Sequence, residues 1–508
     1  MSESSVVSQL PDEKLKLEGG NDSASPFDSS VVVDAAAEES ISLVDNENPY
    51  NWSTKKRWLI TTVFCLMNFA VSIGASIFTP GIGFISYSFG VSTVVATLGL
   101  SFYVLGFSMG PLLFAPMSEV YGRRIVYIPT WLLFCVFQIG CATAQNIETL
   151  LICRFFVGMF GSPSLTVAGG SMSDIWLPNE LGPPLGLFTM TAFLGPVAGP
   201  IVGGFIVEYI KNSAPWRWSF WVQLILSGVL APNLIWLPET YATTLLEKKA
   251  KALGRPLPGG GRKAQSKVFK VAIWRPLEML VFEPVVILVS VYISFLFGIL
   301  YLYFGAYPLI FQGSYHFTSG YSGLAFLGIG IGVILSFPTG ALSNIIYIRL
   351  KKDRRTYPEG RLPMAIVAAV IVPGSIFWFA WSGGRNDVHW IVPVLSGVPF
   401  GWSMVVLFIS QISFLAEGYL EYSASVIAAN TIMRSLFSMA FPLFGPTMYR
   451  AMTPEWAGSL LGFIAIAFMP IPWLFFKYGK WLRRNSRFPT KQELEERERE
   501  REAAGLEA

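Results

Sequence analysis

Residues 58–82 read WLITTVFCLMNFAVSIGASIFTPGI, an apolar stretch of 25 residues without a charged side chain. A helix of about 20 apolar residues spans the ~30 Å hydrocarbon core of a bilayer. Similar blocks recur along the 508-residue chain, of which 53% is hydrophobic and 14% is charged, whereas soluble domains carry roughly 25% charged residues. The blocks lack the alternation of barrel strands, so the sequence predicts an all-α polytopic membrane protein.

Twelve transmembrane helices are predicted from these blocks. They lie near residues 58–82, 94–116, 125–144, 149–172, 186–208, 217–237, 284–308, 321–346, 363–382, 390–415, 424–448 and 456–477. A hydrophilic loop separates the first six from the last six, which suggests two six-helix bundles with a substrate path between them. The predicted order is an acidic disordered tail, an N-terminal bundle, a cytoplasmic linker, a C-terminal bundle and a charged tail, at 1–54, 55–237, 238–283, 284–478 and 479–508.

Lysine and arginine fix the predicted orientation, because cytoplasmic loops are enriched in these residues. With the N-terminus inside, 31 of the 37 lysines and arginines fall on the cytoplasmic side. Both termini are therefore predicted to be cytoplasmic. All four cysteines fall within apolar blocks, where we expect packing roles rather than disulfides.

Two charged side chains remain inside the predicted spans, Arg154 in the fourth and Arg434 in the eleventh. A charge inside the membrane is costly, so both are candidates for a functional role. The alternative is that each binds backbone carbonyls and fastens helices together. The nearest carboxylates, such as Asp174, Glu208 and Glu417, fall at span ends. The sequence therefore locates no protonation site in the middle of a span.

The fifth span contains GPVAGPIVGG, residues 195–204. Gly195, Gly199 and Gly203 recur every four residues on one helix face, where the missing side chain permits close contact with a neighbouring helix. Pro196 and Pro200 each remove a backbone donor and bend the helix. Together with Gly204, these residues favour a bent helix at a gating interface.

The seventh span is rich in aromatic residues. Tyr292, Tyr303 and Tyr307 fall on one helix face, and Gly298, Tyr301 and Gly305 fall on the other. We expect the first face to line a substrate cavity, with Arg434 as a further lining residue; the alternative is that the tyrosines pack in the core. The 40 Phe, 19 Tyr and 16 Trp of the chain suit apolar or aromatic cargo.

The loop after the second span reads GPLLFAPMSEVYGRR, residues 110–124. Glu119 precedes Arg123 and Arg124 by four and five positions across a glycine turn. This density of Gly, Pro and opposite charge favours a latch that re-forms in each transport cycle. The alternative is an anchor that only satisfies the positive-inside rule.

These motifs together resemble the major facilitator superfamily, and more narrowly the fungal twelve-span drug:proton antiporter family, over residues 45 to about 480. The loop 115–124 is similar to the superfamily's loop signature, with Ala115 in place of its leading glycine and Glu119 in place of its aspartate. RFFVG, residues 154–158, matches the fourth-span signature, and 195–204 resembles the antiporter signature. NPYNWS at 48–53 and PETY at 238–241 also recur in the fungal branch. The second half lacks the loop signature, since 349–361 is merely basic.

The resemblance implies roles for several of these residues. Glu119, Arg123 and Asp174 would form a charge relay that stabilises the outward-facing state, and Arg154 would take part in proton transfer. The fold it implies is the major facilitator fold of two six-helix bundles.

The leading functional hypothesis is a secondary active transporter that exports small amphipathic or aromatic compounds by proton antiport. The alternatives are a facilitator or importer on the same fold, and a membrane-embedded enzyme or sensor. No metal-ligand cluster, nucleotide-binding loop or catalytic triad emerges from the sequence, so we expect no enzyme, metal or cofactor. The expected partners are a small-molecule substrate, protons and the lipid bilayer, with no nucleic acid. We expect a monomer in the plasma membrane, with the vacuolar membrane as the alternative.

Overall fold

The computed structural model describes residues 47–177, 180–253, 265–351, 358–385, 387–484 and 486–488. These residues form α-helices joined by short connections. Most of the predicted acidic tail, and the last twenty residues of the chain, lie outside the described ranges.

The first half contains six membrane-length stretches of helix. Its helices are α1 (Thr54–Ser76), α2 (Ile82–Phe89), α3 (Thr93–Tyr121), α4 (Arg123–Thr143), α5 (Ile147–Gly161), α6 (Pro163–Ile175), α7 (Gly182–Tyr209) and α8 (Trp216–Ile235). The first stretch joins α1 to α2, and the fourth joins α5 to α6. Polar caps fix several starts: Ser53 Oγ accepts from Lys56 N at 3.4 Å, and Asn146 Oδ1 accepts from Thr149 N at 2.8 Å.

Within the described ranges, two α-helices lie in the connection between the halves, and seven lie in the second half. The connecting helices are α9 (Ala242–Ala252) and α10 (Gln265–Phe282). The second half consists of α11 (Pro284–Gly313), α12 (Ser319–Leu324), α13 (Leu327–Lys351), α14 (Pro363–Gly383), α15 (Ile391–Gly418), α16 (Ser423–Phe468) and α17 (Ile471–Arg484).

The described residues hold eleven continuous helical stretches long and apolar enough to cross a membrane. The last of them covers Leu420–Arg483, 64 residues, more than twice the length that one crossing needs. It is broken at Thr453, whose backbone has φ +63° and ψ 156°.

The contacts on either side of Thr453 show that the chain reverses there. Before the break, α16 runs parallel to α11, because Phe441 lies against Gly298 and Pro446 lies against Gly305. After the break it runs antiparallel to α14, where Phe377 packs on Phe463 and Trp381 Nε1 donates to Ser459 Oγ at 3.0 Å. The final stretch thus crosses twice, which gives the twelve crossings that the sequence predicts.

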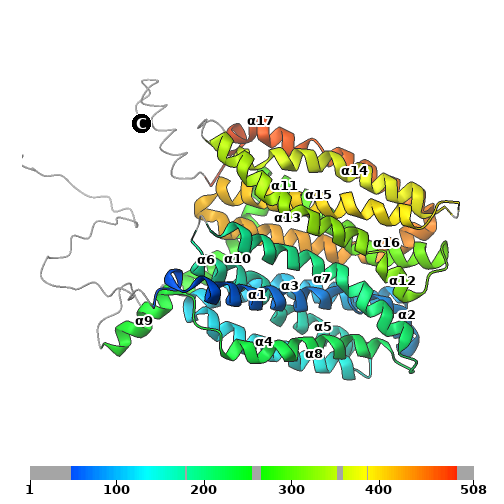
Figure 1. Ribbon diagram of the computed structural model, residues 1–508, viewed down its shortest axis with the longest axis horizontal. Helices are drawn as coiled ribbons and strands as arrows, with labels where there is room; N and C mark the ends of the chain where they lie inside the picture. Colours follow the sequence, from blue (N-terminus) through cyan, green and yellow to red (C-terminus); the bar gives the residue numbers. More distant parts are fainter. Residues whose placement is uncertain are drawn as a thin grey trace, which may run out of the picture. The chain divides into compact units, whose positions relative to one another are not determined.

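The helices form two bundles that lie side by side (Figure 1). In the first bundle α1 packs on α7, α3 on α5, and α4 on α5 and α8; in the second α11 packs on α16, α13 on α15, and α14 on α15 and α16. The bundles meet where α7 contacts α12 and α13, and where α3 contacts α16. We call the end that carries the starts of α1, α4 and α11 the linker end, and the other the far end.

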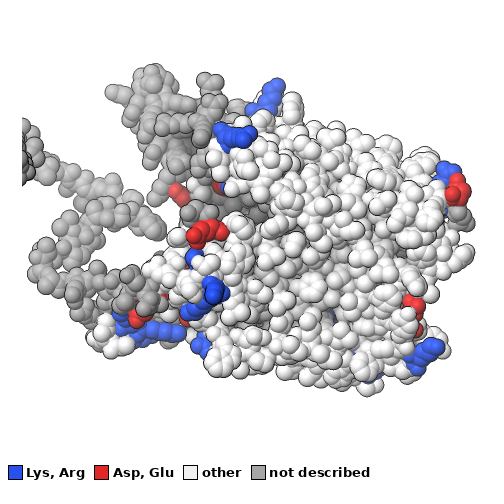
Figure 2. Space-filling view, viewed as in Figure 1, with Lys and Arg blue, Asp and Glu red and all other residues white. Residues whose placement is uncertain are grey.

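Charged side chains gather at these two ends. Figure 2 shows Lys, Arg, Asp and Glu at both ends of the visible face and an uncharged surface between them. Many large apolar side chains are exposed along that surface, for example Leu59, Ile225 and Val229, which are 60–68% exposed. An apolar belt bounded by charge is the surface that a bilayer requires.

Candidate functional site

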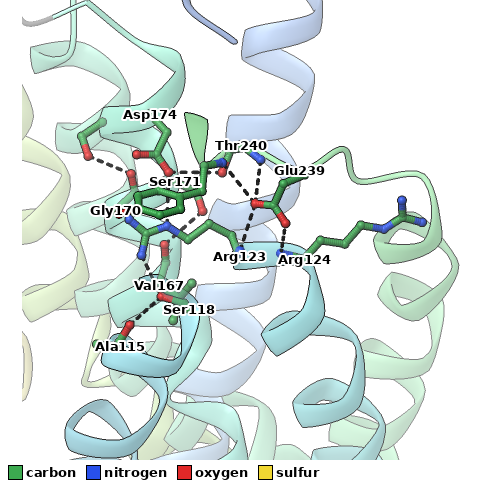
Figure 3. A network of polar contacts seen from close by, with 12 residues as sticks. Ala115, Ser118, Arg123, Arg124, Val167, Gly170, Ser171, Asp174, Glu239 and Thr240 are labelled. Carbon is green, nitrogen blue, oxygen red and sulfur yellow. Dashed lines mark hydrogen bonds and ion pairs between the residues drawn. The ribbon is translucent and has the colours of Figure 1, made fainter. Parts of the chain in front are cut away.

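A cluster of polar contacts joins three helix ends of the first bundle at the linker end (Figure 3). Arg123, the first residue of α4, donates from Nε to Asp174 Oδ2 at 3.2 Å and from Nη1 to Ser118 Oγ at 2.7 Å. Asp174 lies at the end of α6, and Ser118 lies in the last turn of α3. The guanidinium therefore holds the second, third and fourth crossings together at this end.

Glu239, which follows the sixth crossing, completes the cluster. Its carboxylate accepts from the backbone N of Arg123 at 2.9 Å and of Arg124 at 3.1 Å, the first two amides of α4. A carboxylate there satisfies donors that have no partner within the helix and lies favourably in the helix dipole. Thr240 adds a bond from Oγ1 to Asp174 Oδ2 at 3.3 Å.

Gly122 allows this close approach. Its φ is +100°, and a Cβ at this position would lie 2.6 Å from Glu239 Oε2. Both the backbone conformation and the space require glycine.

The structure brings together only part of the predicted relay. Arg123 and Asp174 pair as expected, but Glu119 is exposed and has no recorded hydrogen bond or ion pair with the described part of the chain. Glu239 takes the place in the cluster that the sequence analysis gives to Glu119. Glu239 belongs to the PETY motif noted in the sequence. It lies 116 positions from Arg123, and nothing in the local sequence indicates the contact between them.

The second bundle carries a corresponding cluster, and the prediction that 349–361 is merely basic is wrong for Arg361. This arginine donates from Nη2 to Glu417 Oε1 at 2.6 Å, and its guanidinium lies 3.6 Å from the ring centroid of Tyr347. Arg361 lies two residues before α14, and Glu417 is the next-to-last residue of α15. These helices are the third and fourth crossings of their half, and α4 and α6 hold the same places in the first half. A second pair, Arg483 with Glu359 at 2.6 Å, is almost fully buried.

A third polar contact at this end joins Tyr419 to Glu283, which precedes α11. The hydroxyl donates to Glu283 Oε2 at 2.9 Å. Burial, with the Glu283 carboxylate close by, raises the pKa of Tyr419 well above its usual value. The phenol thus remains a donor at neutral pH.

Arg154 is fully buried and fastens helices together. Its guanidinium donates to the carbonyl oxygens of Gly99 at 3.0 Å, Gly74 at 2.8 Å and Ala75 at 3.4 Å, which belong to α3 and α1. It also lies 4.4 Å from the ring centroid of Tyr103. No carboxylate pairs with it among the described residues. The contacts support the alternative stated for this residue, in which it locks α1, α3 and α5.

The glycines of α7 pack closely against backbone and serine side-chain atoms of α1. A Cβ on Gly195, Gly199 or Gly203 would overlap atoms of Ser72, Ser76 or Ile77. Ser76 Oγ also donates to the carbonyl of Pro196 at 2.9 Å. Helix α7 therefore approaches α1 as closely as its backbone permits, and Pro196 and Pro200 are buried in the same stretch.

The last glycine of the motif faces the second bundle. A Cβ on Gly204 would lie 2.5 Å from Ser319 O of α12. Close by, Glu208 Oε2 accepts from Thr318 Oγ1 at 2.6 Å and from Gly320 N at 2.8 Å. The far end is thus closed between the bundles by contacts of α7 with α12.

The prediction that the tyrosine face of α11 lines a substrate cavity is wrong. Tyr292, Tyr303 and Tyr307 are at most 2% exposed and pack within the second bundle, for example Tyr307 stacked on Phe379 at 4.7 Å. They form core because α11 is apolar all round, so its composition does not indicate which face meets the path. The partly exposed face instead carries Phe297, Tyr301 and Gly305, residues four apart.

The sequence pattern of the Major Facilitator Superfamily matches residues 64–442 of this chain. The chain belongs to this superfamily. It is therefore a multi-pass membrane transporter and not an enzyme.

Curated relatives of this facilitator include proteins named for efflux. It is 40% identical to the "MFS-type efflux pump MFS2" of Trichophyton rubrum, over 87% of this chain and 76% of that protein. It is 37% identical to the "Major facilitator superfamily multidrug transporter mdrA" of Aspergillus fumigatus, over 88% and 75%, and 38% identical to the "Ascochitine biosynthesis cluster MFS transporter" of Didymella fabae, over 88% of each.

Solved structures of low sequence identity share the facilitator fold. The proton:xylose symporter XylE matches with a TM-score of 0.61 at 15% identity, over 84% of this chain and 96% of that one. The human organic anion transporter MFSD10 matches with a TM-score of 0.54 at 17% identity, over 83% and 100%. The predicted fold of two six-helix bundles is confirmed.

Arg434, the other intramembrane charge of this facilitator, lies where the bundles meet. Its guanidinium is 4.5 Å from the ring centroid of Phe297 and 5.3 Å from that of Phe408. The sequence did not indicate these two phenylalanines as site residues, because aromatic residues are too frequent in this chain for any one of them to stand out.

Proposed function

We propose that this transporter exports small amphipathic or aromatic compounds, such as a drug, toxin or secondary metabolite, in exchange for protons. The observation that carries the proposal is the close contact of α7 with α1 at Gly195, Gly199 and Gly203, in a chain 40% identical to a protein named as an efflux pump. Because the α7 side of this contact carries no side chains at these three positions, large side chains do not interlock there when one helix shifts along the other.

The closed far end sets the starting point of the proposed cycle. With the bundles joined there by Glu208 and α12, cargo loads from the linker end. The positive-inside distribution supports placing that end, and both termini, in the cytoplasm. Release follows when the bundles rock and the far end opens. We place the carrier in the plasma membrane as a monomer, with the vacuolar membrane as the alternative.

The charge relay supplies the proposed proton coupling. Arg123 and Asp174 form its paired core, and Glu119, exposed near the end of α3, is available to contact the second bundle when the linker end closes. Arg154 acts in this proposal by holding α1 and α3 to α5. Protonation of a relay carboxylate would weaken the closed linker end and reset the carrier.

A second candidate function is a facilitator or importer that does not use protons. The observation in its favour is that the carboxylates in the described crossings lie near helix ends, and a coupled carrier needs a titratable site reachable from both sides. Flux that continues unchanged after the proton gradient is collapsed would support this candidate.

Purified protein in liposomes with an acidic lumen tests the proposal. Two fluorescent probes, a permanently cationic phenanthridinium and an aromatic sulfonate, are added outside. We expect at least one to accumulate inside, and a protonophore to abolish the accumulation. If neither dye depends on the gradient, proton-coupled export is refuted.

A pair of glycine variants adds the structural control. Gly199→Leu places a side chain against Ser76 and is expected to abolish dye flux. Gly228→Leu lies in α8, where a Cβ meets open space, and is expected to transport like wild type. Equal flux from both variants would show that the α7–α1 contact has no part in transport.

A further inference from the structure

Arg434 is a partly exposed cation without a polar partner. Its guanidinium lies over Phe297 and Phe408, and the structure records no hydrogen bond or ion pair for it with any described residue. Arg154 is different, since it is fully buried and donates to three carbonyl oxygens. One of the two intramembrane arginines is thus satisfied within the fold, and the other keeps its donors available.

The two rings beneath Arg434 belong to the second bundle, and a third ring from the first bundle packs against both. Phe297 comes from α11 and Phe408 from α15, and their centroids are 5.6 Å apart. Phe193 of α7, two residues before the Gly195-Pro196 bend, lies 5.3 Å from each. Three rings from three helices therefore form one aromatic cluster across the interface between the bundles. The Arg434 guanidinium, from a fourth helix, lies over two of these rings, Phe297 and Phe408.

Arg434 lies well inside a membrane-length helix. It lies 11 residues into α16 and 19 residues before the break at Thr453, which places it roughly 16 Å from the start of the helix, about a third of the way to the break. Phe297, one of the two rings under Arg434, lies on the partly exposed face of α11, one turn before Tyr301. The cluster thus lies beside the path between the bundles rather than in the core of either one.

Charge complementarity then limits what this site accepts. Carboxylates of the described crossings lie near helix ends or at the break in α16. Glu119, Asp174, Glu208 and Glu417 lie within the last three residues of a helix, Glu148 is the second residue of α5, and Glu455 follows Thr453 by two residues. No acidic side chain in the described residues pairs with Arg434, although an unpaired charge in a low-dielectric site is costly. Its planar fork of N–H donors matches a carboxylate in two-point geometry, and the flat rings match an aromatic body.

We propose that Arg434, with Phe193, Phe297 and Phe408, binds an aromatic organic acid, whose carboxylate pairs with the guanidinium and whose ring packs in the cluster. This inference rests on the proposed export function and names the substrate class of the same path. Because Phe193 belongs to the first bundle, rocking of the bundles separates it from the other two rings and loosens the site.

Binding of two probes that differ only in charge tests the proposal. Calorimetric titration of the purified full-length protein at neutral pH compares 2-naphthoate with 2-naphthamide, which has the same shape and no charge. We expect the carboxylate to bind about 10- to 100-fold more tightly, the range for charge-assisted hydrogen bonds in a partly desolvated site. Arg434→Gln should remove this preference and retain the binding of the amide.

Two further variants keep the test decisive. Lys211→Gln removes an exposed charge near the end of α7 and should keep the full preference. Arg434→Lys retains the positive charge without the planar fork of donors, and it should keep only part of the preference for the carboxylate. This variant still tests the site if Arg434→Gln does not fold. Equal affinity of wild type for the two probes, or an undiminished preference in Arg434→Gln, would overturn the anion site.

The outcomes separate this inference from the export proposal. A carboxylate preference that depends on Arg434, in a protein without gradient-driven dye flux, supports the anion site and refutes proton-coupled export. Gradient-driven flux without any carboxylate preference refutes the anion site alone.

Discussion

Replacing Glu208 by Gln is expected to open the far end. Glu208 lies next to last in α7, and its Oε2 accepts from Thr318 Oγ1 at 2.6 Å and from Gly320 N at 2.8 Å. Thr318 is the N-cap residue of α12, so the carboxylate of one bundle caps a helix of the other. The glutamine side chain keeps the shape and an acceptor oxygen but removes the charge.

The size of the effect follows from these two bonds. A hydrogen bond to a charged group contributes about 1.5–3 kcal/mol, and a neutral one about 0.5–1.5 kcal/mol. Because the Thr318 bond is exposed and the Gly320 bond is partly buried, the lower values apply. The loss is then about 1–2 kcal/mol in all, and a roughly 5- to 30-fold shift from closed to open follows.

Distances between spin labels measure this shift directly. Labels at Tyr87, in α2, and Trp456, just after Thr453, report on the two bundles at the far end; both side chains are well exposed, at 91% and 59%. Glu208→Gln should enlarge the population at long distance. Glu148→Gln, an exposed carboxylate at the same end, should not. An unchanged distribution in Glu208→Gln, or equal shifts in both variants, would refute the reasoning.

Three other substitutions test the remaining contacts. Gly122→Ala should lower thermal stability by about 1–3 kcal/mol, because it strains a φ of +100° and crowds Glu239 Oε2; Gly228→Ala is the matched control, and thermal unfolding in detergent is the measurement. Tyr307→Phe should leave stability and transport unchanged, because the hydroxyl is buried without a recorded hydrogen-bond partner; an altered KM for cargo would contradict the core position. Asp174→Asn should cost about 1–2 kcal/mol and slow transport, as seen by unfolding and dye flux, because the guanidinium at the start of α4 loses its carboxylate; full activity would contradict the relay.

Features of the fold that depend on short stretches of sequence could be predicted. Crossing number follows from the length of apolar blocks, because a membrane fixes the length that each helix must have. The close contact of α7 with α1 follows from glycines every four residues, because only one helix face is left without side chains. The pairing of Arg123 with Asp174 came from resemblance, since the two residues lie 51 positions apart.

Contacts that depend on assembly were not predictable. The face of α11 that meets the path could not be chosen, because a helix that is apolar all round has no polar side to exclude. The carboxylates that accept from the first amides of α4 and that pair with Arg361 are set by which helix ends meet. In the sequence these residues, Glu239 and Glu417, resemble ordinary loop-end acids. Phe193, Phe297 and Phe408 became visible as a cluster only when three helices were placed side by side.

The position of the polar contacts indicates how the two bundles move. At the linker end, the ion pairs of Arg123 and Arg361 each stay within one bundle, so they stiffen that bundle and do not hold it to the other. In the described residues, the recorded hydrogen bonds that join the bundles are those of Glu208 and one from Ser101 Oγ to Met439 O at 2.8 Å. Three hydrogen bonds of about 1–2 kcal/mol each hold a closure that rocking can break. The bundles can therefore move as rigid bodies. The aromatic cluster beside Arg434 changes shape with them, because Phe193 belongs to the first bundle and Phe297 and Phe408 to the second.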